Sequence, residues 1–124
     1  MLIKQTHLQP FQIPLLILMG TPEQINRHVA KVIGPGKSNL KAEGFGGGVT
    51  LVMPPKVEFP TIIVAFPDDP EAEAIAHEAV HVMWFIHRIH GVELGPASEE
   101  WMAYTIGYIV RTILEEYGWD EVEP

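Results

Sequence analysis

The chain has 124 residues, 47% of them apolar and 19% charged, and we expect a single folded domain over residues 1–124. Eight Lys and Arg residues stand against sixteen Asp and Glu residues, which gives a net charge of -8. This balance argues against nucleic-acid binding, because neutralising phosphates requires clustered positive charge.

Cysteine is absent, so disulfides, thiolate ligands and thiol nucleophiles are excluded. Any metal ion must therefore be bound by nitrogen and oxygen atoms. The longest apolar run, residues 11–19, contains Gln12 and Pro14 and has about half the length that spans a bilayer. We therefore expect no membrane partner and a cytoplasmic location.

The N-terminal part of the chain predicts a strand followed by a helix. Residues 11–19 are rich in Ile and Leu, and Pro14 favours an edge strand or a bulge. Thr21 can cap a helix that runs to about Ile33, with Gln24 completing a capping box.

Two further strands are expected at residues 49–53 and 61–66, which could pair as an antiparallel hairpin. Four glycines between positions 44 and 48 precede the first of them. These glycines lack the strand, helix and Lys-Ser context of a phosphate-binding loop, so a loop beside the functional site is the better interpretation.

The second half predicts two helices. The first is capped by Asp68 or Asp69 and ends at Gly91. The second begins near Ala97 or Ser98 and ends at Gly118. The expected fold is therefore α+β. It contains a small mixed sheet of about three strands, the early helix on one face, and the two C-terminal helices on the other.

The first C-terminal helix carries the pattern His-Glu-x-x-His at His77, Glu78 and His81. Histidines at i and i+4 lie about 40° apart around a helix, so both ring nitrogens can meet one ion. Glu78 lies beside them, where it can hold a water on the ion and take its proton. The pattern predicts a zinc ion with Glu78 as general base, whereas the alternative is two histidines that merely share a helix face.

A catalytic zinc also needs a third protein ligand and an open position for water. In the extended pattern of some metallopeptidases that ligand is a third histidine, preceded by a glycine. Here position 87 is His, but position 84 is Trp where the pattern has glycine, so this arrangement does not fit. A glutamate on the following helix is the remaining choice.

Glu100 is the preferred third ligand, and Glu99 stays open as the alternative. Glu100 shares one helical stripe with Tyr104, Gly107 and Arg111, and Gly107 would permit close contact with the preceding helix. Tyr104 is a second catalytic candidate, because its hydroxyl could donate to the oxyanion of amide hydrolysis, although it could equally pack.

With His-Glu-x-x-His on one helix and a Glu on the next, residues 77–111 resemble the gluzincin metallopeptidases, and the layout is similar to that of the ImmA/IrrE-type peptidases. More narrowly, the sequence His-Glu-Ala-Val-His-Val-Met-Trp, followed by Glu-x-x-Ala-Tyr and Gly-Tyr-Ile-Val-Arg, resembles small bacteriophage-encoded proteins. The resemblance implies a zincin-like fold and zinc at His77, His81 and Glu100. It further implies base catalysis by Glu78 and a sheet whose edge strand aligns an extended substrate.

These observations favour a zinc-dependent peptidase that acts on a peptide or protein, in the host cytoplasm if the chain is phage-encoded. The main alternative is a catalytically silent protein on the same scaffold, with a structural or assembly role. A third possibility is a toxin or regulatory factor that cleaves one host protein. The sequence identifies neither the substrate nor the oligomeric state.

Overall fold

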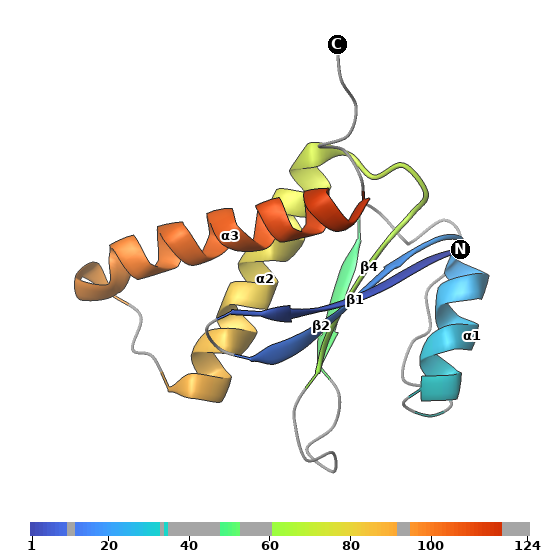
Figure 1. Ribbon diagram of the computed structural model, residues 1–124, viewed down its shortest axis with the longest axis horizontal. Helices are drawn as coiled ribbons and strands as arrows, with labels where there is room; N and C mark the ends of the chain where they lie inside the picture. Colours follow the sequence, from blue (N-terminus) through green and yellow to red (C-terminus); the bar gives the residue numbers. More distant parts are fainter. Residues whose placement is uncertain (10–11, 33, 35–47, 53–60, 92–94, 118–124) are drawn as a thin grey trace.

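The computed structural model describes residues 1–9, 12–32, 34, 48–52, 61–91 and 95–117 (Figure 1). Its strands are β1 (Leu2–Leu8), β2 (Ile13–Met19), β3 (Val49–Val52) and β4 (Ile62–Phe66). Its helices are α1 (Pro22–Val32), α2 (Ala72–His90) and α3 (Glu99–Tyr117), with the short 3-10 helix η2 (Pro96–Ser98) before α3.

The four strands form one mixed sheet in the order β1-β2-β4-β3. β1 is antiparallel to β2, β2 is parallel to β4, and β3 is antiparallel to β4. The expected α+β class and the antiparallel pairing of the two later strands are confirmed. The sheet has one strand more than expected, because β1 presents exposed Lys4 and Gln5 and lacks the apolar signal of an inner strand.

The prediction that Pro14 marks an edge strand is wrong, since β2 lies between β1 and β4. The pairing of β2 with β4 begins one residue later, where Leu15 faces Ile62. Pro14 therefore leaves no gap in the parallel ladder, and the proline is tolerated at the start of an inner strand.

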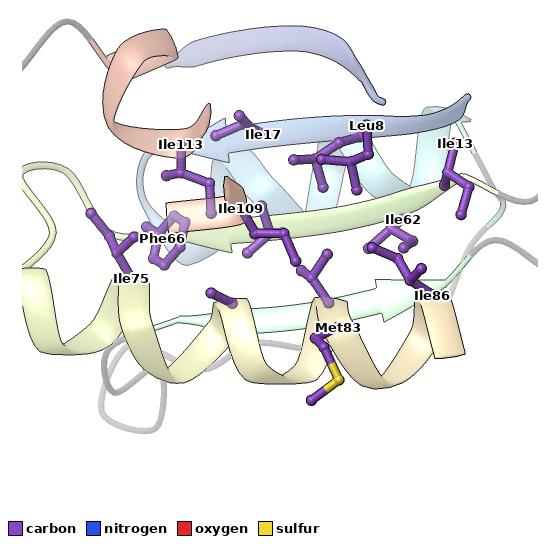
Figure 2. Close-up of a cluster of buried hydrophobic side chains, with 14 of the residues drawn as sticks. Leu8, Ile13, Ile17, Ile62, Phe66, Ile75, Met83, Ile86, Ile109 and Ile113 are labelled. Carbon is purple, nitrogen blue, oxygen red and sulfur yellow. The ribbon is translucent and has the colours of Figure 1, made fainter. Parts of the chain in front are cut away.

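Alternating side chains of β2 and β4 build a core on each face of the sheet. Leu16 and Leu18 pack with Ile25 and Val29 of α1. The residues between them face α2 and α3, where Phe66 and the isoleucines labelled in Figure 2 are buried. The predicted division, with α1 on one face and the two later helices on the other, is confirmed (Figure 1).

The start of α1 has the predicted capping box. The Gln24 backbone N–H donates to Thr21 Oγ1 at 3.2 Å, and the Thr21 backbone N–H donates to Gln24 Oε1 at 3.0 Å. Two N–H groups that the helix cannot satisfy are thereby paired.

The predicted cap of α2 at Asp68 or Asp69 is wrong, whereas its predicted end is confirmed. The N-cap is Glu71, with an extended backbone and no side-chain cap bond. Asp69 has a φ of 57° and its Oδ1 accepts a hydrogen bond from the Tyr117 hydroxyl at 3.2 Å, so this side chain fastens the end of α3. Gly91 closes the helix with a φ of 70° and donates its N–H to the carbonyl of His87.

No helix within the described residues is long and apolar enough to cross a membrane. α3 reaches Tyr117, and the predicted end at Gly118 lies outside the described residues.

Candidate metal centre

The packing of α2 fixes how its His-Glu-x-x-His pattern is presented. Ile75, Ala79 and Val82 are buried against the sheet, which sets the rotation of the helix. Because Glu78 lies next to this buried face, its side chain is enclosed and the residue is only 4% exposed. His77 and His81 lie on α2 farther from the buried face than Glu78, and both are exposed.

The two histidine rings approach each other through their Nε2 atoms, which are 3.3 Å apart. The ring centroids are 5.0 Å apart and the ring planes are inclined at 62°. Two nitrogen ligands at Zn–N distances of about 2.0–2.1 Å and a tetrahedral angle lie roughly 3.3–3.4 Å from each other. The observed separation between the Nε2 atoms of His77 and His81 therefore equals one edge of a zinc coordination tetrahedron.

In the absence of a metal ion, the same separation allows a hydrogen bond between the two rings, with the donor set by the tautomer of each histidine. Nitrogen is also a ligand that zinc prefers, and a chain without cysteine has only nitrogen and oxygen to offer. The pair fits a shared ion by both its chemistry and its spacing.

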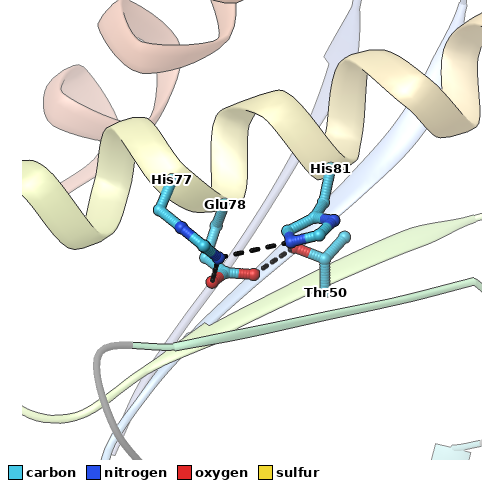
Figure 3. A network of polar contacts seen from close by, with 4 residues as sticks. All are labelled: Thr50, His77, Glu78 and His81. Carbon is cyan, nitrogen blue, oxygen red and sulfur yellow. Dashed lines mark hydrogen bonds and ion pairs between the residues drawn. The ribbon is translucent and has the colours of Figure 1, made fainter.

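The carboxylate of Glu78 is held between the histidine pair and the edge strand β3 (Figure 3). Thr50 Oγ1 donates a hydrogen bond to Glu78 Oε1 at 2.7 Å. Glu78 Oε2 lies 3.8 Å from His77 Nε2. One carboxylate oxygen is thus bound by β3, while the other faces the position where the two imidazoles converge.

Gly48, just before β3, allows the strand to come this close to α2. A Cβ atom at this position would lie 3.0 Å from Glu78 Cγ, 3.0 Å from the Ala65 carbonyl oxygen and 2.9 Å from Phe66 Cδ1. Real Cβ atoms essentially never approach other atoms closer than this. A side chain at position 48 would therefore push β3 away from Glu78.

The expectation that the Gly107 stripe packs against the preceding helix is wrong. Glu100, Tyr104, Gly107 and Arg111 are all exposed, and a Cβ atom on Gly107 would meet nothing within 4 Å. The face of α3 that packs on the core carries Thr105, Ile109 and Ile113 instead, with several half-buried apolar neighbours. Apolar side chains determined which face of α3 is buried, since only they gain free energy by leaving water.

The structure does not bring Glu100 to the histidine pair. Across the ranges that the structure describes, no group of three or more His, Asp or Glu side chains is arranged to hold a metal ion. Glu99 is exposed as well, and Tyr104 is 76% exposed. In Figure 3 the side chains of His77, Glu78 and His81 point toward β3, away from the visible part of α3.

Reasoning from the sequence missed Thr50 as a site residue, and it placed Gly48 beside the site only as one member of a glycine-rich loop. The bond from Thr50 to Glu78 joins residues 28 positions apart. No local spacing links them, and only the pairing of β3 at the sheet edge beside α2 brings them together. The glycine-rich stretch before β3 was the one available signal, and its last member, Gly48, does lie beside the site. Residues 44–47 lie outside the described part of the chain.

Comparison with known proteins identifies no relative: no protein-family model, curated protein or solved structure matches the chain significantly.

Proposed function

We propose that this protein is a zinc-dependent hydrolase of peptide bonds in which His77 and His81 hold the metal ion and Glu78 is the general base. The observation that carries the proposal is the 3.3 Å separation of the two Nε2 atoms, with Glu78 Oε2 3.8 Å from one of them. Two nitrogen ligands and a carboxylate on one side of a helix are part of what metal-assisted hydrolysis requires, and a third protein ligand would complete the set.

A zinc ion bound by the pair would polarise the carbonyl of the scissile bond and acidify a water molecule. The protein's own residues supply the rest. Glu78 Oε2 faces the pair and can accept the proton of the attacking water, and the same carboxylic acid can return that proton to the leaving amine. Because Glu78 is buried, its interactions with charge at the site are weakly screened by solvent.

Strand β3 supports a peptide as the substrate. It is the last strand of the sheet and pairs with β4 on one side. The other side of an edge strand carries backbone N–H and C=O groups that can pair with an extended chain. A peptide added there would run beside Thr50, whose side chain contacts Glu78, so its backbone would pass close to the general base.

The first experiment measures the zinc content of protein purified without chelators or nickel. We expect about one zinc per chain in the wild type and none in His77→Ala or His81→Ala, while His7→Ala on the outer strand β1 keeps its zinc. Wild-type protein that stays metal-free and rejects added zinc would refute the metal centre.

The third ligand is decided by the same measurement. Glu100 remains the prediction from the sequence, and its exposed position leaves it apart from the pair in this structure. Loss of zinc in Glu100→Gln, with zinc retained in Glu99→Gln, would assign Glu100 and require α3 to shift on α2. Zinc retained in both variants would place the third ligand elsewhere.

Catalysis is tested separately with Glu78→Gln. This variant keeps both histidines, so it should bind zinc like the wild type. When it is incubated with total cellular protein, mass spectrometry should detect no cleavage products. An assembly role would survive the substitution, because it needs the scaffold and not the base. Equal cleavage by Glu78→Gln and the wild type would eliminate Glu78 as the base.

A further inference from the structure

We propose that Thr50 is a positioning residue for the general base, holding Oε1 of Glu78 so that Oε2 is presented to the metal-binding pair. This inference rests on the proposed function and adds to it a residue outside the His-Glu-x-x-His helix. Thr50 would act through Glu78 and would not touch the metal or the substrate carbonyl.

The two oxygens of the Glu78 carboxylate have different surroundings. Oε1 accepts the Thr50 hydroxyl at 2.7 Å, a short bond of the kind made to charged acceptors. Oε2 is left 3.8 Å from His77 Nε2. The terminal torsion of a glutamate is otherwise broad, so a single strong bond decides how the carboxylate plane is turned.

Because Glu78 is buried, its hydrogen bond from Thr50 strongly influences the orientation of the carboxylate. Glu78 is 4% exposed, so little water can replace the Thr50 hydroxyl if it is removed. The hydrogen bond of a charged group is stronger away from water, and leaving such a group unpaired is costly. A Glu78 carboxylate without Thr50 would therefore turn to find another donor, and the histidine pair is on its open side.

β3 reaches Glu78 because its approach is unobstructed. Gly48 lets the backbone pass where a Cβ atom would lie 3.0 Å from Glu78 Cγ, and two residues later Thr50 delivers its hydroxyl. Among the described strands, the edge strand that could pair with an extended peptide is thus also the strand that carries Thr50. Binding of substrate and orientation of Glu78 would be linked through one short segment.

A purely structural role is the alternative, in which Thr50 only satisfies a buried carboxylate. The two roles predict different behaviour at the metal. We would replace zinc by Co²⁺, whose visible absorption responds to the immediate surroundings of the ion, and compare Thr50→Val with Thr50→Ser. Valine keeps the shape and removes the hydroxyl, whereas serine keeps the hydroxyl. Thr112→Val is the matched control, because its hydroxyl bonds to the Tyr108 carbonyl within α3.

We expect Thr50→Val to bind one Co²⁺ with wild-type affinity and to shift the visible bands, while Thr50→Ser and Thr112→Val keep the wild-type spectrum. The shift should disappear when Thr50→Val is made in the Glu78→Gln background, because both changes act through the same carboxylate. On any peptide that the wild type cleaves, Thr50→Val should lower kcat by roughly tenfold or more, with KM unchanged and activity restored by serine.

The failures are distinguishable. A wild type that binds neither zinc nor Co²⁺ removes the proposed function, and this inference falls with it. If the wild type and Thr50→Val both bind Co²⁺ and give the same spectrum, the positioning role of Thr50 is overturned while the proposed metal centre stands. A band shift that persists in the Glu78→Gln background also overturns it, because Thr50 would then act by another route.

Discussion

Replacing Gly48 by alanine tests whether β3 packs on Glu78 as closely as the structure shows. The new Cβ atom would lie 2.9–3.0 Å from a ring carbon of Phe66, the carbonyl oxygen of Ala65 and Cγ of Glu78. The carbonyl belongs to the backbone of β4, and Phe66 is fully buried, so neither can turn aside cheaply. β3 must therefore move outward.

Forcing atoms into a packed site of this kind costs about 1–3 kcal/mol. Alanine also lowers the entropy of the unfolded chain, which offsets about 0.4–1 kcal/mol of that cost. We expect a net loss of about 1–2 kcal/mol in the free energy of unfolding. For a domain of this size each kcal/mol corresponds to a fall in Tm of roughly 3–5 °C.

Gly107→Ala provides the matched control. Gly107 lies within α3, and a Cβ atom there would meet nothing within 4 Å. Alanine favours a helix over glycine by up to about 1 kcal/mol, so this variant should be more stable than the wild type.

Urea unfolding followed by far-UV circular dichroism measures both variants. The same chemical change should move the midpoints in opposite directions, with unchanged slopes. A Gly48→Ala protein at least as stable as the wild type would show that β3 does not approach Glu78 this closely. That result would also contradict the close contact between Thr50 and Glu78 on which the positioning role depends.

Three other predictions follow from the described packing. Ile109→Ala should lose about 2–5 kcal/mol in urea unfolding because Ile109 is fully buried, whereas Ile3→Ala at a 46% exposed position should change little. The pKa of Tyr117 is raised because its hydroxyl is desolvated and donates to Asp69. The neutral form is therefore favoured in the folded state, and its contribution to stability is present below the ordinary tyrosine pKa of about 10 and lost as the pH rises through the folded value. The urea midpoint should fall less steeply above about pH 10 in Tyr117→Phe than in the wild type, and equal slopes would contradict this. Tyr104→Phe should leave kcat unchanged because Tyr104 is 76% exposed on α3, and a large loss of turnover would restore its predicted role as oxyanion donor.

The parts of the fold that could be predicted from the sequence depend on local chemistry. The capping box of Thr21 and Gln24 and the glycine end of α2 at Gly91 are formed by residues within a few positions of each other. The apolar runs of β2 and β4 were recognisable because inner strands are buried on both faces.

The predictions that failed depend on contacts between distant residues. Asp69 looked like a cap in sequence, but its side chain binds Tyr117, 48 positions away. The Gly107 stripe looked like a contact surface because glycine permits close approach, yet a helix is oriented by its apolar side chains. The preference for Glu100 over Glu99 as third ligand rested on that stripe.

Glu78 is a carboxylate residue on the otherwise apolar buried face of α2. It lies among Ile75, Ala79 and Val82 on the buried side of α2, where an apolar residue would cost less to fold. The chain keeps a carboxylate there, gives it one donor in Thr50, and leaves its second oxygen facing two exposed imidazoles. Burying a carboxylate costs free energy unless it is paired, and here the partners are the Thr50 hydroxyl and His77, whose Nε2 lies 3.8 Å from Oε2. The proposed role of Glu78 as general base would explain why the chain keeps a carboxylate at this buried position.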